Sequence, residues 1–272
     1  MSQKILQANL NHCRAAQDLF LQAMAECGGG LGIAAEPYRV PRDHPCWAVD
    51  RRGSVAITWR QTAEPVACTR IETGDGFVAV KWDHITGSYQ VAVYVSPNIS
   101  SAQFNEYLGR LWDCVTKILP EPVVVAGDFN AKSALWGSPV TDTRGKIFER
   151  WAAGLGLCIV NSGTTQTCVR RWGGSIVDIT WTSPYAARRI TRWRVADETE
   201  TMSDHRYVEM DISVTPPEVW ARRRELPRRF PRWALRKMDQ DKFRASIQTS
   251  LWADDVLVQS EDVKRRGGFG AS

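Results

Sequence analysis

The 272-residue chain has an ordinary globular composition, with 43% hydrophobic and 24% charged residues and a formal net charge of +5. Its seven cysteines are scattered, odd in number and never in a C-x-x-C pair, which argues against a disulfide framework or a zinc ribbon and indicates a reducing compartment. No apolar run is long enough for a signal peptide or a membrane span, so we expect a soluble protein that is not secreted.

The first part of the chain alternates strand-like and helix-like patterns. We predict a strand at 5–10, a helix at 14–26 that ends at Gly28-Gly29-Gly30, and a strand at 31–35. Four further strands are predicted at 54–59, 66–71, 77–82 and 89–95. Turn signals at 74–76 and 86–88 separate the last three of these strands and favour antiparallel hairpins.

The second part repeats this alternation. A helix is predicted at 100–119, with Ser100 or Ser101 as N-cap, and another at 143–155, beginning near Thr141-Asp142. A strand beginning at Val123 lies between these helices, and strands return at 158–161, 176–181, 191–195 and 207–214.

Pro216-Pro217 marks a predicted boundary. Much of the excess positive charge follows it, beginning with Arg222-Arg223-Arg224, and a helix-compatible segment spans 237–252. We therefore predict a main domain at 1–213 and a basic linker or tail at 214–272, partly helical or disordered. The arginines of this tail either contact backbone phosphates of a nucleic acid or belong to a solvated segment without such a role.

The tetrapeptide Gly127-Asp128-Phe129-Asn130 directly follows the apolar run 122–126. A buried run that stops at a glycine and then presents Asp-x-Asn is typical of a strand tip that aims two polar side chains into a cleft. Asp128 is suited to accept the proton of an attacking water, and Asn130 to hold that water or a phosphate oxygen. The alternative is an Asx-turn, in which Asp128 only satisfies backbone donors.

A second polar cluster, Ser203-Asp204-His205, precedes the last predicted strand. Asp178 has apolar neighbours inside a strand pattern, where a carboxylate is costly to bury unless it is paired. Pairing with His205 would satisfy Asp178 and fix the charge and tautomer of the histidine. The alternatives are a purely structural pair or an outward-facing Asp178.

Glu36 follows a predicted strand and precedes Pro37, which turns the chain. A carboxylate at such a position suits a hard cation, and Asn9, at another strand end, could orient Glu36 or a metal-bound water. The alternative makes Glu36 a solvated loop residue and Asn9 a turn residue. The other histidines, His12, His44 and His84, lie in loop-like or polar surroundings, and we predict no role for them.

Six segments in this order resemble the exonuclease–endonuclease–phosphatase superfamily, the fold of DNase I and of abasic-site endonucleases. They are Gln7-Ala8-Asn9-Leu10-Asn11, Glu36-Pro37-Tyr38, Tyr94-Val95-Ser96-Pro97-Asn98, Gly127-Asp128-Phe129-Asn130, Ile176-Val177-Asp178 and Ser203-Asp204-His205. Within the superfamily, the chain looks most like the endonuclease domain of arthropod non-LTR retrotransposons. The motifs that carry this closer resemblance are Ala35-Glu36-Pro37-Tyr38, Ser96-Pro97-Asn98, Ala134-Leu135-Trp136-Gly137 and Asp142-Thr143-Arg144-Gly145.

The resemblance implies an α/β fold, a four-layer sandwich of two mostly antiparallel sheets flanked by helices, with a basic C-terminal tail. It also implies a metal site formed by Glu36, Asn9 and Asp204 that takes Mg²⁺, with Mn²⁺ as the other possibility. The resemblance further implies which residues are catalytic and which contact the substrate. The catalytic residues would be Asp128, Asn130, Asp178, His205 and Tyr94, and the substrate contacts Asn98, Arg144 and Ser203.

The function implied is a Mg²⁺-dependent endonuclease that nicks double-stranded chromosomal DNA and leaves a 3′-hydroxyl to prime reverse transcription. A reverse transcriptase domain encoded by the same element would be its partner, and its location would be nuclear, otherwise cytoplasmic. The alternatives are a phosphodiesterase or phosphatase acting on abasic DNA, RNA or a phosphoinositide, or an inactive DNA-binding fragment. Asn11 stands where repair enzymes tend to carry an acid, which disfavours repair.

Three of the twelve tryptophans, Trp136, Trp172 and Trp181, lie near the predicted site in sequence. We expect them in the core; the alternative is that they stack on bases or wedge a groove.

Overall fold

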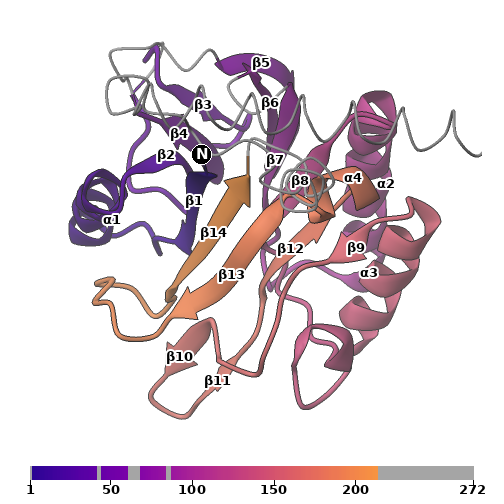
Figure 1. The fold of residues 1–272 in the computed structure, drawn as a ribbon. Coiled ribbons are helices and arrows are strands. Elements are labelled where there is room, and N and C mark those ends of the chain that lie inside the picture. The colour runs from indigo at the N-terminus through magenta and orange to yellow at the C-terminus, as the bar shows by residue number, and fades with distance from the viewer. Residues whose placement is uncertain (1, 42–43, 61–67, 84–86, 214–272) are drawn as a thin grey trace, which may run out of the picture. The chain divides into compact units, whose positions relative to one another are not determined.

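The computed structural model describes residues 2–41, 44–60, 68–83 and 87–213, all within one compact unit, Met1–Trp220. Its main features are two six-stranded sheets (Figure 1). The predicted boundary at Pro216-Pro217 and the basic segment 214–272 lie outside the described residues. None of the helices in the described part of the chain is long and apolar enough to cross a membrane.

The first sheet has the strand order β13-β14-β1-β2-β4-β3. Its strands are β1 (Ser2–Asn9), β2 (Gly29–Ala35), β3 (Trp47–Val49), β4 (Val55–Trp59), β13 (Ile190–Ala196) and β14 (Tyr207–Ser213). Strands β1 and β2 are parallel, joined by the crossover helix α1 (Arg14–Glu26), and the other pairs are antiparallel. Parallel pairing brings the C-terminal ends of β1 and β2 to the same edge of the sheet.

The second sheet repeats this plan with the order β5-β6-β7-β8-β12-β9. Its strands are β5 (Cys68–Thr73), β6 (Phe77–Trp82), β7 (Ser88–Tyr94), β8 (Val123–Asp128), β9 (Cys158–Ile159) and β12 (Asp178–Thr182). Strands β7 and β8 are parallel, joined across α2 (Ser101–Ile118), and the other pairs are antiparallel. A separate hairpin, β10 (Cys168–Arg170) and β11 (Gly173–Ser175), precedes β12.

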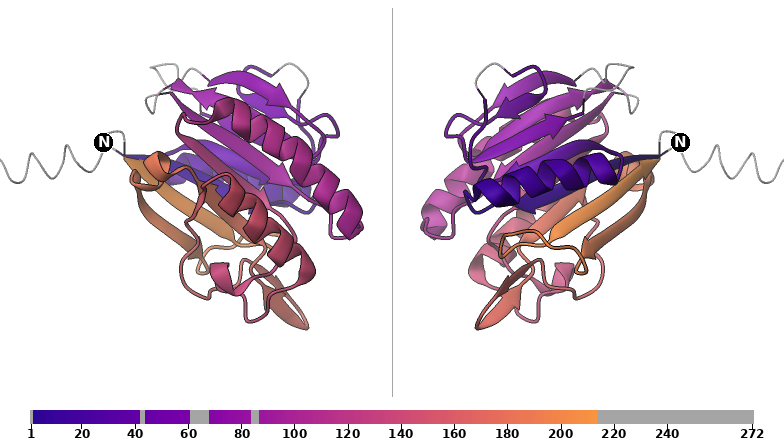
Figure 2. Two further views of the ribbon diagram at one scale, coloured as in Figure 1. Left: turned by 90° about the vertical axis from the view of Figure 1, so that its right-hand side faces the viewer. Right: turned by 90° about the vertical axis from the view of Figure 1, so that its left-hand side faces the viewer.

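Three apolar clusters hold four layers together. Figure 2 shows the ribbons of these layers from two sides. Between the sheets, Ile33 and Ile57 of the first pack with Val80 and Val124 of the second. On the outer face of the first sheet, α1 buries Phe20 and Met24. Helices α2 and α3 (Thr143–Gly154) cover the outer face of the second sheet. The predicted four-layer α/β sandwich is therefore confirmed, with sheets that are mixed but mostly antiparallel.

Helix boundaries follow the capping chemistry expected from the sequence. Ser100 caps α2 in a capping box, in which its hydroxyl accepts from the Gln103 backbone and the Gln103 side chain accepts from Ser100. Asp142 caps α3 by accepting from the Gly145 backbone at 2.6 Å. The glycine run predicted to end α1 divides differently: Gly28 turns with φ +69°, while Gly29 and Gly30 belong to β2.

Five short elements were not predicted: β3, β10, β11, the 3-10 helix η2 (Ala134–Trp136) and α4 (Pro184–Ala187). Each is three or four residues long, too short for a hydrophobic period to be recognised.

Candidate active site

Side chains from both sheets meet where three strands end and two others begin. Asn9 is the last residue of β1, Glu36 follows β2, and Asp128 is the last residue of β8. Asp178 begins β12 and pairs in register with Asp128, because β12 runs antiparallel to β8. His205 lies two residues before β14, which pairs with β1. The topology thus gathers residues separated by up to 196 positions.

Asn9 links two carboxylates at the centre of the cluster. Its Nδ2 donates to Glu36 Oε2 at 2.9 Å and to Asp128 Oδ2 at 3.0 Å. Its Oδ1 accepts from the Asn11 backbone at 2.8 Å, which fixes the orientation of the amide. The hydroxyl of Tyr94 donates to the other oxygen of Glu36 at 2.5 Å. Both oxygens of Glu36 are therefore held by donors from neighbouring strands.

His205 and Asp178 form a buried pair beside this centre. His205 Nδ1 lies 2.8 Å from Asp178 Oδ2, while Nε2 lies 4.0 Å from Asp128 Oδ2. A carboxylate oxygen accepts, so Nδ1 carries a hydrogen and Nε2 faces Asp128. Thr167 Oγ1 accepts from the Asp178 backbone at 3.2 Å, and this hydroxyl was not predicted to matter. The predicted pairing of Asp178 with His205 is present in the geometry.

Burial and charge shift the titration of this group in opposite ways. Burial works to lower the pKa of His205, but the negative charge of Asp178, and then that of Asp128, raises it well above its usual value. Burial, and after it the charge of Asp178, raises the pKa of Asp128 to about 7. A protonated imidazole and a carboxyl group that titrates near neutrality therefore lie side by side.

Ser203 and Asn130 fix neighbouring segments of the site through hydrogen bonds. Ser203 Oγ donates to the Asn9 backbone carbonyl at 2.8 Å and accepts from the His205 backbone at 3.2 Å. Asn130 Nδ2 donates to Val95 O at 3.0 Å and to Asp128 Oδ2 at 3.1 Å. The Asn130 backbone also donates to Asp128 Oδ1 at 3.0 Å, so the Asx-turn alternative and the cluster occur together.

Of the predicted contacts, Asn98 lies on the loop that follows β7, and Arg144 lies in the first turn of α3 and binds that loop. Asn98 is exposed and donates through its backbone to Ser96 Oγ at 3.3 Å. Arg144 donates to the backbone carbonyls of Ser96 at 3.1 Å and Pro97 at 2.9 Å, and also to that of Ile99. Its guanidinium therefore orders this loop. Direct contact of either residue with a substrate stays a prediction.

Asp204 lies beside His205, yet its hydrogen bonds run away from Glu36. Asp204 Oδ2 accepts from Arg170 Nε at 2.8 Å and lies 3.8 Å from the Cys168 thiol. Burial works to raise the pKa of Asp204, but the bond from Arg170 and the charge of His205 keep it below its usual value. Its proposed part in the metal site stays a prediction, and so does that of Asn9, whose Oδ1 is already occupied.

Backbone strain concentrates here. Asn11, His12, Glu36 and Asn130 have φ between +45° and +52°, a region that residues other than glycine rarely adopt. In the described residues one other non-glycine, Met202, has positive φ, and it precedes Ser203. Such conformations persist where the surrounding structure imposes them, as at functional sites.

A hard divalent cation fits the accessible side of the cluster. Asp178 and Asp128 lie beside His205, and Asn9 links Asp128 to a third carboxyl group, Glu36. Among the described residues, no hydrogen-bond partner is found for the buried Asp178 Oδ1. The side chain of Glu36 is 20% exposed, whereas those of Asp128 and Asp178 are 1% exposed. Glu36 is thus the carboxylate that can bind an ion which keeps several of its waters, as Mg²⁺ does.

Among the described residues, another group brings three ligand atoms within 4.8 Å of one another: Cys168, Asp204 and His205. A thiol suits softer ions than Mg²⁺.

His12 was assigned no role from the sequence, yet it lies against Glu36, with 3.6 Å between Nε2 and Oε1. Its position directly after Asn9-Leu10-Asn11 is the signal that could have identified it.

Two of the three tryptophans near the site are core residues, as expected: Trp136 is 1% exposed and Trp181 3%. The expectation is wrong for Trp172, which is 89% exposed beyond the end of β10. Arg171 lies over its ring, 5.1 Å from the centroid. Trp172 lies in the two-residue turn between β10 and β11, outside the three apolar clusters of the described residues.

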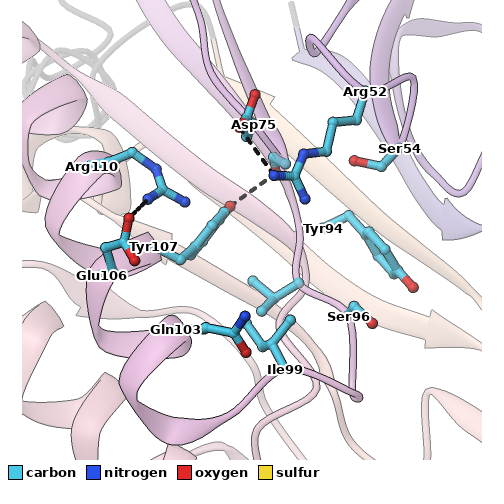
Figure 3. Close-up of a pocket in the computed structure, with 12 residues that line it drawn as sticks. Arg52, Ser54, Asp75, Tyr94, Ser96, Ile99, Gln103, Glu106, Tyr107 and Arg110 are labelled. Carbon is cyan, nitrogen blue, oxygen red and sulfur yellow. Dashed lines mark hydrogen bonds and ion pairs between the residues drawn. The ribbon is translucent and has the colours of Figure 1, made fainter.

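A cavity of about 310 Å³ adjoins Tyr94 and Ser96 (Figure 3). Its rim carries two arginines, each paired with an acid: Arg52 with Asp75 at 3.2 Å, and Arg110 with Glu106 at 2.7 Å. The cavity extends the accessible surface from Tyr94 across the start of α2.

Comparisons with known proteins agree with this geometry. A family model described as endonuclease-reverse transcriptase matches residues 89–209, a range that includes Tyr94, Asp128, Asp178 and His205. No characterised protein in the curated set matches the sequence significantly.

Solved structures that match cover most of the chain. One is the endonuclease domain of TRAS1, a telomere-specific non-LTR retrotransposon, with 25% identity, a TM-score of 0.69, and coverage of 79% of this chain and 99% of that one. A 3′ phosphatase, NExo from Neisseria bound to a product DNA hairpin, has 17% identity, a TM-score of 0.61 and coverage of 78% and 99%. An AP endonuclease from Archaeoglobus fulgidus has 16% identity, a TM-score of 0.61 and coverage of 77% and 99%.

Proposed function

From the membership of this chain in the DNase I-like superfamily of phosphodiester hydrolases, we propose that it is a Mg²⁺-dependent DNA endonuclease of a non-LTR retrotransposon. It nicks one strand of chromosomal DNA and leaves a 3′-hydroxyl that primes reverse transcription by a polymerase domain of the same element. The observation that carries the proposal is the chain of contacts from Glu36 through Asn9 to Asp128 and the Asp178–His205 pair.

The side chains divide the chemistry of hydrolysis among them. Glu36 would hold the divalent cation, which when bound would neutralise charge on the phosphate. Asp128 accepts the proton of the attacking water, for which a pKa of about 7 is well matched to neutral pH. Asn130, anchored to the Val95 carbonyl, orients that water.

His205 acts on the phosphate side of the reaction. Asp178 holds the imidazole protonated with Nε2 on the Asp128 side, so that Nε2–H can donate to an oxygen of the scissile phosphate. When the P–O3′ bond breaks, the departing 3′-oxygen takes up a proton and becomes the 3′-hydroxyl. The raised pKa of His205 keeps this donor charged through neutral pH.

DNA is the substrate favoured by the neighbouring surfaces. The hairpin that follows Thr167 carries Arg170 and Arg171 beside the exposed Trp172, a combination that suits contact with phosphates and a groove. The TRAS1 domain, the neighbour with the highest of the three identities, is described as part of a telomere-specific retrotransposon. A chromosomal target would place the protein in the nucleus.

A plasmid-nicking assay with Mg²⁺, run beside an abasic oligonucleotide, an RNA and an inositol phosphate, tests the proposal. We expect open-circular plasmid whose nicks a DNA polymerase extends directly, since the ends carry 3′-hydroxyls. Turnover of the inositol phosphate alone would refute the retrotransposon function. Cleavage confined to abasic DNA would indicate repair, and DNA binding without cleavage would indicate an inactive fragment.

A further inference from the structure

His12 lies at the accessible edge of the site and is held there by two partners. Its Nδ1 is 3.2 Å from the carbonyl oxygen of Pro37, and its backbone N–H donates to the carbonyl oxygen of Glu36 at 2.8 Å. The side chain is 60% exposed, so the ring is open to solvent. With φ values of +47° at Asn11 and +52° at His12, the backbone is held in a conformation that directs this ring toward Glu36.

His12 presents its second ring nitrogen to Glu36. A carbonyl oxygen only accepts, so Nδ1 must carry a hydrogen. In the uncharged ring, Nε2 then presents its lone pair to Glu36 Oε1 at 3.6 Å. Nε2 and Oε1 are thus two lone-pair donors that a single cation can accept together.

The surroundings favour a metal ion. Metal-binding histidines characteristically donate their other ring nitrogen to a carbonyl or carboxylate, as Nδ1 does here with Pro37. Glu36 already receives one hydrogen bond on each oxygen, from Tyr94 and from Asn9, so its orientation is set without His12. An oxygen and a nitrogen ligand are thereby presented together on the exposed side of the cluster.

Resting on the proposed metal-dependent function, we propose that His12 Nε2 binds the divalent cation together with Glu36 Oε1. The mixed nitrogen and oxygen site favours first-row ions such as Mn²⁺ over Mg²⁺, which prefers oxygen ligands alone. The chain would then use a nitrogen ligand beside Glu36 and bind Mn²⁺ more tightly than Mg²⁺, while the proposed nicking would still proceed with Mg²⁺.

The test measures binding of Mn²⁺ to the protein without DNA, so it does not depend on nicking. Electron spin echo spectroscopy of bound Mn²⁺ detects a directly coordinated imidazole nitrogen through its ¹⁴N modulation. Loss of the free Mn²⁺ signal on titration gives the affinity, and competition with Mg²⁺ gives the selectivity. The variants are His12→Ala, His12→Gln and a control on an exposed histidine outside the site, His44→Ala.

We expect ¹⁴N modulation in the wild type and in His44→Ala, and its loss in both His12 variants. His12→Ala should weaken Mn²⁺ binding about 10–100-fold, in the range seen when support of a metal ligand is removed, and weaken Mg²⁺ binding far less. Modulation that persists in His12→Ala would overturn the proposal. Tighter Mn²⁺ binding in His12→Ala would also overturn it, since a protonated His12 paired with Glu36 would then have competed with the ion.

These results separate the inference from the function on which it rests. If wild-type protein nicks plasmid with a metal ion but shows no nitrogen ligand, the proposed function is supported and the His12 proposal is refuted. If wild-type protein binds Mn²⁺ through His12 but does not cut DNA, the His12 proposal is supported and the proposed function is refuted.

Discussion

Replacing Asp178 with asparagine should change how the reaction depends on pH. Asp178 lies 2.8 Å from His205 and is 1% exposed, so its charge acts on His205 across a poorly screened contact. Without that charge, the pKa of His205 falls toward its ordinary value near 6.5, because burial disfavours the charged ring. Each unit by which this pKa falls corresponds to about 1.4 kcal/mol. The pKa of Asp128 also falls, since Asp178 is the second cause of its rise.

Both limbs of the pH–rate profile should therefore move to lower pH in Asp178→Asn. The loss of rate should be about 10²–10⁴-fold at pH 8, the range for a general acid or base, and smaller at pH 5.5, where His205 regains its proton. Single-turnover plasmid nicking between pH 5.5 and 9 measures this. A loss that is constant across this range would refute the reasoning.

The stability of the same variant gives a second readout. Because the folded-state pKa of His205 is raised, the pair stabilises the fold fully below the unfolded value near pH 6.5, and this contribution declines as pH rises through the folded value. The loss in Tm should therefore be larger at pH 5.5 than at pH 9. Asp50→Asn is the matched control, a buried carboxylate that binds the backbone of Ser54 and Gly76. Asp50→Asn should lower Tm but leave both limbs of the pH–rate profile at their wild-type pH.

Three further predictions concern the metal, the backbone and the hairpin. Saturating Mn²⁺ or Mg²⁺ should raise Tm in calorimetry, because an ion concentration of 100 times Kd stabilises the fold by about 2.7 kcal/mol. Glu36→Gln should abolish this gain. Gly127→Ala should cost about 2–3 kcal/mol or more in urea unfolding, because a Cβ would lie 1.9 Å from the Val93 carbonyl oxygen, whereas Gly109→Ala, with open space around it, should stabilise α2. Trp172→Ala should leave Tm unchanged but weaken DNA binding about tenfold in a filter-binding assay; unchanged affinity would remove the hairpin from the DNA interface.

Local chemistry explains why much of the fold could be predicted from the sequence. Ser100 and Asp142 cap helices where their side chains can reach the first-turn amides, and the apolar run before Gly127 forms a strand buried on both faces. Periodicity in 14–26 and 77–82 predicted α1 and β6 with their observed bounds. These signals lie within a few residues of one another, so no tertiary information is needed.

The remaining features depend on contacts between distant segments. Asp178 meets Asp128 because β12 pairs with β8 in one register, which a one-residue slip would destroy. His12 looks like any loop histidine until β1 and β2 align as parallel neighbours and bring it to Glu36. Trp172 differs from Trp136 only in what lies around it, and composition does not encode that.

The central claim is that one cluster of side chains hydrolyses DNA, and nicking by matched preparations of wild type, His205→Ala and Asp128→Asn tests it most directly. With supercoiled plasmid and a divalent metal ion, we expect wild-type nicking that EDTA abolishes. Each variant should lose several hundredfold or more, since removing one preorganised group costs about 10²–10³ in rate. Equal nicking by all three folded preparations would contradict the account and indicate a contaminating nuclease.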